Sequence, residues 1–261
     1  MQDNILEIKN LSKYFGGLAA VSNCSFKVRQ GTITGIIGPN GSGKTTLFNL
    51  IAGNLKSSTG SVLFNDENIT DVPSYELFSK GLLRTFQIAH EFTNLSVLEN
   101  LMMVPGNQSG EKLMSALLKP GLVAKEESQI KEKAMEVVDF LNLSHLKNEL
   151  AGNLSGGQKK LLELGRTMMV DAKLVLLDEV GAGVNRTLLK DLGTAIEKLN
   201  KEKGYTFCMI EHDMDFIGRL CDPVIVMAEG SVLFEGTVED AKKDEKVIES
   251  YLGRGSKLKD N

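Results

Sequence analysis

The sequence predicts an α/β fold that combines a mostly parallel sheet, an antiparallel β subdomain and a helical subdomain. Apolar strands alternate with amphipathic helices in the C-terminal half, a pattern typical of parallel sheets. The first thirty residues alternate apolar and polar side chains, and the middle of the chain has helical spacing. The 261 residues suffice for one large domain or two small ones.

The N-terminal segment predicts antiparallel strands. Its apolar residues alternate at positions 5–8 and again at positions 24–28, on either side of a turn at Gly16-Gly17. The following elements are expected to be a buried strand at 32–37, a helix at 45–52 with Gly53 as its C-cap, and a strand at 61–64.

The region from Val97 to about Leu150 predicts helices. Ile130, Ala134, Val137, Val138 and Leu141 mark one helical face. The irregular stretch from Pro105 to Pro120 is expected to be an insertion. The elements expected further on are a helix at 157–171, a strand at 174–177, a helix at 188–199, a strand at 206–210, and a hairpin at 224–234 around Glu229-Gly230.

Composition and charge exclude several classes of function. A net charge of −4 without a dominant basic block argues against nucleic acid as a partner. Cys24, Cys208 and Cys221 lack metal-ligand spacing and are expected to be reduced, partly buried thiols of a cytosolic protein. We find neither a signal peptide nor an apolar run of about 18 residues, so any role at a membrane is expected to be peripheral.

Residues 38–45 fit the phosphate-loop pattern G-x-x-x-x-G-K-[ST]. Glycines let the backbone wrap around a phosphate chain, and the N–H groups that open the next helix point at its oxygens. The candidate nucleotide-binding residues are Gly38, Pro39, Asn40, Gly41, Ser42, Gly43, Lys44, Thr45 and Thr46. Lys44 supplies a charge to the β- and γ-phosphates, and the Thr45 hydroxyl is a candidate Mg²⁺ ligand. A chance match is the alternative, but the preceding strand and following helix favour the functional interpretation.

Asp178 and Glu179 end an apolar strand. Two surface carboxylates at a strand end are common and need no function. Beside a phosphate loop, however, Asp178 suits a Mg²⁺-bound water, and Glu179 could orient or deprotonate the attacking water.

The pentapeptide at 154–158 reads Leu-Ser-Gly-Gly-Gln. Locally it predicts a serine N-cap and a glycine turn that open the next helix. A serine hydroxyl and free N–H groups at a helix start also form a second anion site, which a nucleotide held by Lys44 does not need within one chain.

With these motifs in this order, the chain resembles the ATP-binding-cassette (ABC) ATPases over nearly its whole length. The resemblance implies a P-loop NTPase core, ATP and Mg²⁺ as cofactors, and one domain at 1–253 with a helical subdomain at about 88–165, followed by a flexible tail at 254–261. It also implies a dimer in which the pentapeptide of one subunit completes the phosphate-loop site of the other. The residues that would do so are Ser155, Gly156, Gly157 and Gln158.

Three further roles follow from the resemblance. Gln87 occupies the place of the glutamine that senses Mg²⁺ and water, and His212 matches the switch histidine that contacts the γ-phosphate. Phe15 aligns with the aromatic residue that stacks on adenine, although Tyr14 could stack instead, and core packing is an alternative for Phe15. Val180 replaces a common proline before the loop at 181–185, which puts the rigidity of that loop in doubt.

Within the family, the chain resembles the larger ATPase subunit of branched-chain amino-acid importers. The matching segments are 15–17, 19–21, 84–87, 95–100, 182–185, 211–214 and 251–253. The implied partners are membrane permease subunits, a second ATPase subunit (the same chain or a sibling) and, indirectly, a periplasmic or extracellular binding protein. The implied location is the cytoplasmic face of the membrane. An ATPase of a urea or amide importer would have almost the same sequence features. The spacing of the motifs disfavours an ABC ATPase that acts on DNA or ribosomes. A P-loop kinase is disfavoured because it would leave LSGGQ without a role.

Overall fold

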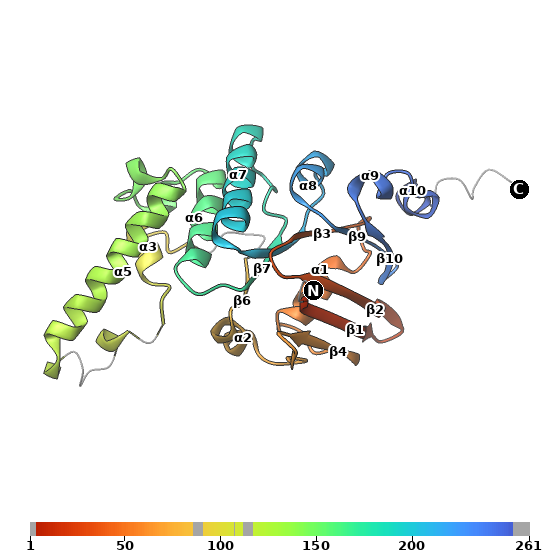
Figure 1. The fold of residues 1–261 in the computed structure, drawn as a ribbon, viewed down its shortest axis with the longest axis horizontal. Coiled ribbons are helices and arrows are strands. Elements are labelled where there is room, and N and C mark those ends of the chain that lie inside the picture. The colour runs from red at the N-terminus through yellow and green to blue at the C-terminus, as the bar shows by residue number, and fades with distance from the viewer. Residues whose placement is uncertain (1–3, 86–90, 107, 112–116, 253–261) are drawn as a thin grey trace, which may run out of the picture. The chain divides into compact units, whose positions relative to one another are not determined.

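The computed structural model describes residues 4–85, 91–106, 108–111 and 117–252. The chain forms two compact units, which are drawn in Figure 1. The first comprises Met1–Arg84, Lys173–Gly181 and Ile196–Asn261, and the second comprises Thr85–Ala172 and Ala182–Ala195. The predicted tail at 254–261 lies outside the described residues.

An antiparallel sheet of four strands forms one layer of the first unit, in the order β2-β1-β4-β5. Its strands are β1 (Asn4–Phe15), β2 (Leu18–Arg29), β4 (Thr59–Phe64) and β5 (Glu67–Asn68). Leu6, Ile8 and Phe26 are buried, whereas Lys9, Ser25 and Lys27 are exposed, so one face of the sheet packs on the core. The predicted antiparallel pair is confirmed.

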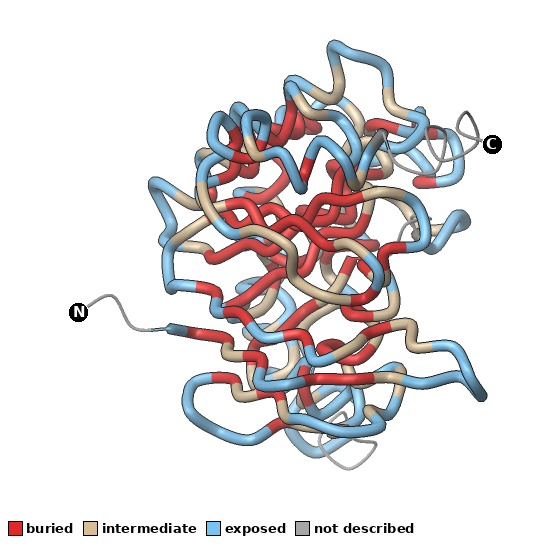
Figure 2. The backbone as a smooth tube through the Cα atoms, turned by 90° about the vertical axis from the view of Figure 1, so that its right-hand side faces the viewer, coloured by how far each residue is buried: buried red, intermediate tan, exposed pale blue. Residues whose placement is uncertain are grey.

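A second sheet of six strands carries the parallel core of the same unit, in the order β10-β9-β3-β8-β7-β6. Its strands are β3 (Ile33–Ile37), β6 (Leu82–Arg84), β7 (Leu174–Asp178), β8 (Thr206–Ile210), β9 (Val224–Ala228) and β10 (Ser231–Gly236). All residues of β3, β7 and β8 are buried, as expected for parallel strands that are covered on both faces. Figure 2 shows the buried segments running through the interior. β10 pairs antiparallel with β9, which confirms the predicted hairpin.

Helix α1 (Lys44–Ile51) joins the two sheets through one hydrophobic core. Leu47 and Phe48 lie in a cluster that also holds Leu6 from β1 and Leu176 from β7. The helix ends one residue earlier than predicted: Ala52 is its C-cap, and Gly53 follows in the left-handed conformation, φ 68°. The other described helices of this unit are α2 (Ser74–Lys80), the part of α7 (Arg186–Lys203) from Ile196 onward, α8 (Met214–Leu220), α9 (Val238–Ala241) and α10 (Glu245–Leu252).

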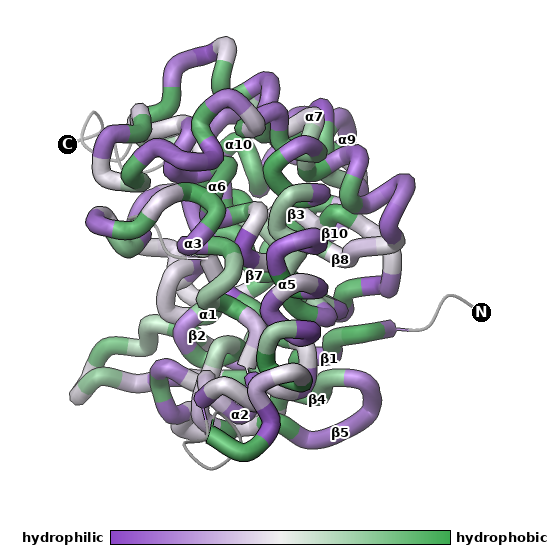
Figure 3. Tube along the Cα trace, turned by 90° about the vertical axis from the view of Figure 1, so that its left-hand side faces the viewer, coloured by the Kyte–Doolittle hydropathy of each residue, from purple (hydrophilic) through white to green (hydrophobic). Residues whose placement is uncertain are grey.

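The second unit is helical in its described residues. Its elements are α3 (Val97–Met102), α5 (Pro120–Phe140), α6 (Gly156–Met168), the first part of α7 (Arg186–Lys203), and the short 3₁₀ turns η1 (Ser109–Glu111), η2 (Ser144–Leu146) and η3 (Ala151–Asn153). Ala134, Val137 and Val138 are buried on the predicted face of α5, whereas Ile130 is only half-buried. Hydrophilic and hydrophobic residues alternate along these helices (Figure 3), because one face of each packs inward.

Two expectations about solvent and membrane can be compared with the structure. All three cysteines are free and buried, more completely than predicted, and burial raises the pKa of Cys24 to about 12. Among the described helices, none is both long and apolar enough to cross a membrane.

Candidate nucleotide site

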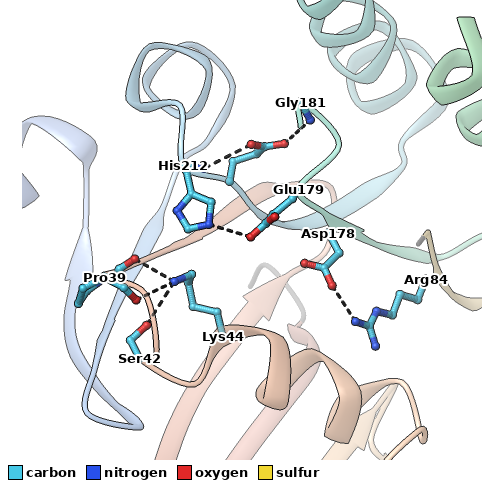
Figure 4. A network of polar contacts seen from close by, with 10 residues as sticks. Pro39, Ser42, Lys44, Arg84, Asp178, Glu179, Gly181 and His212 are labelled. Carbon is cyan, nitrogen blue, oxygen red and sulfur yellow. Dashed lines mark hydrogen bonds and ion pairs between the residues drawn. The ribbon is translucent and has the colours of Figure 1, made fainter. Parts of the chain in front are cut away.

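Three loops meet where the parallel strands β3, β7 and β8 end. Asp178, the last residue of β7, pairs with Ile210, the last residue of β8, and Ile210 also lies beside Ile36 of β3. The carboxyl ends of parallel strands lie on one edge of a sheet, so the segments that follow are brought together. Those segments are the phosphate loop, Glu179 with its neighbours, and Glu211-His212 (Figure 4).

The phosphate loop has no space for side chains at two of its glycines. A Cβ added to Gly38 would lie 2.1 Å from the Met227 carbonyl oxygen, and one added to Gly43 would lie 2.3 Å from the Ala20 carbonyl oxygen. Gly43 also has φ 98° and directly precedes α1. The loop backbone therefore packs against the surrounding strands in a conformation that only glycine adopts without strain, and it leads into the free N–H groups of a helix start.

Lys44 folds back over the loop from the first position of α1. Its ammonium donates to the carbonyls of Gly38 and Pro39 at 2.8 and 3.0 Å, and to Ser42 Oγ at 3.4 Å (Figure 4). Burial lowers the pKa of Lys44, while the nearby carboxylates of Glu179 and Asp178 act to raise it. Asn40 and Thr45 are exposed, and Thr46 is half-buried. Three of the predicted loop residues, Gly38, Pro39 and Ser42, therefore contact the Lys44 ammonium.

Asp178 is held by an arginine, Arg84, for which the sequence motifs predict no role. Arg84, at the end of β6, donates to Asp178 Oδ2 at 2.7 Å and to Asn49 Oδ1 at 2.6 Å. The Arg84 and Asp178 side chains are only 11% and 4% exposed. A charged residue in a strand that pairs with the buried strand β7 was the signal in the sequence that could have revealed this ion pair.

The oxygen donors at this edge fit Mg²⁺ held jointly with a nucleotide. The second oxygen of Asp178 and the Thr45 hydroxyl are hard ligands of the kind that Mg²⁺ prefers. The described residues include no group of three or more His, Cys, Asp or Glu side chains that could hold a metal. Since Mg²⁺ commonly keeps waters and uses one or two protein ligands plus phosphate oxygens, this sparse set suits such a site.

Glu179 and His212 contact one another directly. His212 Nε2 lies 2.8 Å from Glu179 Oε1, and the side chains are 46% and 22% exposed (Figure 4). Glu179 has a left-handed backbone, φ 49°, and its N–H donates to the Ile210 carbonyl at 2.9 Å. A non-glycine residue in this conformation is strained and is common at functional sites. The strand edge thus presents a carboxylate and an imidazole side by side.

The pentapeptide opens α6 in the second unit. Ser155 Oγ accepts from the Gln158 N–H, and Gln158 Oε1 accepts from the Ser155 N–H, which together form a capping box. The predicted local role as a helix cap is therefore confirmed. Ser155 and Gly156 are exposed, whereas Gly157 is buried, and a Cβ there would lie 2.5 Å from the Leu188 side chain. Contact with a partner's nucleotide stays a prediction.

The remaining candidates have different outcomes. Phe15 and Tyr14 are 50% and 48% exposed, so core packing does not account for Phe15. Both rings are accessible, and the choice of adenine-stacking residue stays open. Gln87 lies outside the described residues. Val180 is buried, and the next residue, Gly181, is held through its N–H by Glu211.

The sequence of residues 21–182 matches the family described as ABC transporter, which is well over half of the chain. The chain belongs to the ABC transporter family. It is 44% identical, over 95% of both chains, to the Archaeoglobus fulgidus protein named "Probable branched-chain amino acid transport ATP-binding protein LivG". It is 33% identical to the high-affinity branched-chain amino acid transport ATP-binding protein LivG of Escherichia coli, over 97% of this chain and 99% of the other.

Solved structures of ABC ATPases have the same fold. A nucleotide-free ATP-binding cassette from an ABC transporter superposes with a TM-score of 0.83, at 40% identity, over 97% of this chain and 100% of the other. A cassette in its ADP conformation gives a TM-score of 0.82 at 39% identity, over 97% of this chain and 100% of the other. The predicted fold and the predicted membership of the ABC family are confirmed. The chain is a nucleotide-binding ATPase subunit of an ABC transporter, and as such it works with permease subunits and a second ATPase subunit.

Proposed function

We propose that this ATPase subunit drives the import of branched-chain amino acids. The cluster of Lys44, Asp178, Glu179 and His212 at one sheet edge is the observation that carries the ATPase part, because it combines a phosphate loop with a carboxylate and an imidazole. The names of the relatives with 33% to 44% identity support the transported substrate. Residues that would contact an amino acid belong to other subunits, so this chain supplies the motor.

Within the site, each residue has a proposed task. The loop N–H groups and Lys44 bind the phosphates, and Lys44 exchanges its present contacts with the Gly38 and Pro39 carbonyls for phosphate oxygens. Thr45, Asp178 and Gln87 would hold Mg²⁺. Mg²⁺ supplies charge neutralisation of the phosphate oxygens.

Glu179 orients and deprotonates the attacking water, and His212 contacts the γ-phosphate. In the present structure the two side chains bind one another at 2.8 Å. Both must therefore rotate apart, or accept a water and a phosphate oxygen between them, when ATP binds. The exposed fraction of His212, 46%, leaves the ring room to do so.

The second half of each site comes from a partner ATPase subunit. Ser155 and Gly156 are exposed at the start of a thirteen-residue helix, where free N–H groups favour an anion. We place the subunit on the cytoplasmic face of the membrane, bound to permease subunits and served indirectly by a periplasmic or extracellular binding protein. Phe15 or Tyr14 stacks on the adenine.

Uptake by cells tests the transported substrate. We expect loss of the gene to abolish uptake of labelled leucine, isoleucine and valine, and the intact gene to restore it, whereas a Lys44→Ala copy does not. Unchanged leucine uptake together with lost uptake of urea or of an amide would reject the substrate while keeping the ATPase. Absence of ATP hydrolysis by the purified chain assembled with its permease would reject the ATPase assignment itself.

A further inference from the structure

Glu211 is a buried carboxylate between the two loops that carry Glu179 and His212. Its side chain lies directly after β8, and the residue is 4% exposed. Oε1 accepts a hydrogen bond from the Gly181 N–H at 2.7 Å, and Oε2 accepts one from the His212 N–H at 3.3 Å. Figure 4 shows these contacts beside the Glu179 and His212 side chains.

The burial of this group calls for an explanation. Taking a carboxylate out of water is costly unless hydrogen bonds satisfy it. Burial raises the pKa of Glu211, and the two backbone N–H groups act in the opposite direction. An apolar side chain would fill the same place without this cost. The benefit of a carboxylate here is that one oxygen accepts from Gly181 of the neighbouring loop while the other accepts from the N–H of the next residue, His212.

The loops that follow β7 and β8 need such a link because the hydrogen bonds between the two strands end just before these loops. The last rung is the hydrogen bond from the Glu179 N–H to the Ile210 carbonyl, 2.9 Å long. Beyond it, β7 and β8 give way to loops, and Glu179 already has a left-handed backbone. The Glu211 carboxylate spans the gap between Gly181, two residues past Glu179, and His212.

We propose that Glu211 is a positioning residue that fixes the His212 backbone relative to the Glu179 loop for ATP hydrolysis. The proposal rests on the proposed roles of Glu179 and His212. Glu211 does not touch the phosphate loop in any contact described above. Its loss should therefore act on turnover through His212, while nucleotide binding by the Lys44 loop is retained.

Kinetics of four single variants and one double variant test this role in the chain assembled with its permease. Glu211→Ala removes both acceptors, and we expect kcat to fall by about 10- to 100-fold, as small misplacements of reacting groups do. Glu211→Gln keeps one acceptor oxygen and should recover part of this loss. The dissociation constant for ATP, measured with a fluorescent analogue, should change by less than about threefold, because the loss of Glu211 should not affect binding of ATP before the reaction. Glu249→Gln, on the exposed side of α10, is the matched control and should hydrolyse ATP normally.

A double-mutant cycle separates positioning from general damage. If Glu211 acts through His212, Glu211→Ala combined with His212→Ala should be no slower than His212→Ala alone, within about twofold. The proposal would be overturned if the double variant lost kcat by the product of the two single losses. A normal kcat in Glu211→Ala, or a loss of ATP affinity as large as its loss of kcat, would also overturn it. If Glu211→Ala does not fold, the same cycle with Glu211→Gln decides. Failure of the proposed function is seen separately, because His212→Ala and Glu179→Gln would then retain the activity of the unmodified chain.

Discussion

Arg84 and Asp178 form a buried ion pair, 2.7 Å between the guanidinium Nη2 and the carboxylate Oδ2. The pair connects the last residue of β6 to the last residue of β7, and Asn49 from α1 accepts the second guanidinium bond. An acidic side chain that is proposed to serve Mg²⁺ is thus already neutralised by an internal cation.

The first prediction concerns stability. Arg84→Met leaves Asp178 buried without its cation, and we expect the free energy of unfolding to fall by about 3–5 kcal/mol. Urea unfolding measures this loss. Lys80→Met is the control, because it breaks the more exposed pair with Glu67, which is 2.8 Å long, and should lower the free energy of unfolding by at most about 1 kcal/mol. Equal small losses in both variants would contradict the importance of the buried pair.

The second prediction concerns Glu179. Glu179→Gln should reduce turnover at least about 100-fold, as loss of a general base does, while ATP binding persists. The amide can still hydrogen-bond to His212, so the fold of the loop should be kept. We expect an ATP-bound dimer to accumulate, which size-exclusion chromatography with ATP detects beside a phosphate-release assay. Retained steady-state hydrolysis would count against Glu179 as the base.

The third prediction concerns Ser155. A Lys44→Ala chain mixed with a Ser155→Arg chain should give heterodimers with one sound site and one doubly damaged site. ATP binding by the mixture should therefore exceed that of either variant alone, because each homodimer has only damaged sites. Equilibrium binding of labelled ATP at constant total protein measures the difference. A mixture no better than its components would reject action between subunits.

The fourth prediction concerns the phosphate loop. Gly43→Ala places a Cβ 2.3 Å from the Ala20 carbonyl oxygen, which forces the loop to shift. We expect overpacking to lower the free energy of unfolding by about 1–3 kcal/mol, in addition to the effect of backbone strain. ATP binding should also weaken, because the loop N–H groups lose their alignment. Gly31→Ala is the control, since Gly31 also has a positive φ, 74°, but its Cβ would meet nothing within 4 Å. Equal effects of both changes on ATP binding would contradict the close-approach argument.

The fifth prediction concerns pH and Glu211, whose pKa is raised by burial above the ordinary 4.5. The folded state then holds the Glu211 proton more tightly than the unfolded state does. The protonated carboxyl therefore adds to the free energy of unfolding below about pH 4.5, and this contribution is lost as the pH rises through the pKa of the folded state. Glu211→Gln removes this dependence. The stability of the variant relative to the unmodified chain should therefore increase with pH across that window. Chemical unfolding at several pH values measures it, and a constant difference would contradict the raised pKa.

Much of the fold was predictable because its signals are local. The alternation in β1 and β2, the apolar runs of β7 and β8, and the helical face of α5 each follow from the spacing of side chains along the chain. Element ends were less predictable: α1 and Gly53 differ by one position from expectation, because caps depend on backbone angles.

Residue types at short fixed spacing were enough to predict the phosphate loop, the Asp178-Glu179 pair and the serine cap at Ser155. Which distant side chains complete these motifs depends on the tertiary structure. Arg84 reaches Asp178, and Glu211 joins Gly181 to His212, because parallel pairing brings the ends of β6, β7 and β8 to one edge. Spacing along the chain carries no record of such contacts, whereas the register of the sheet specifies them.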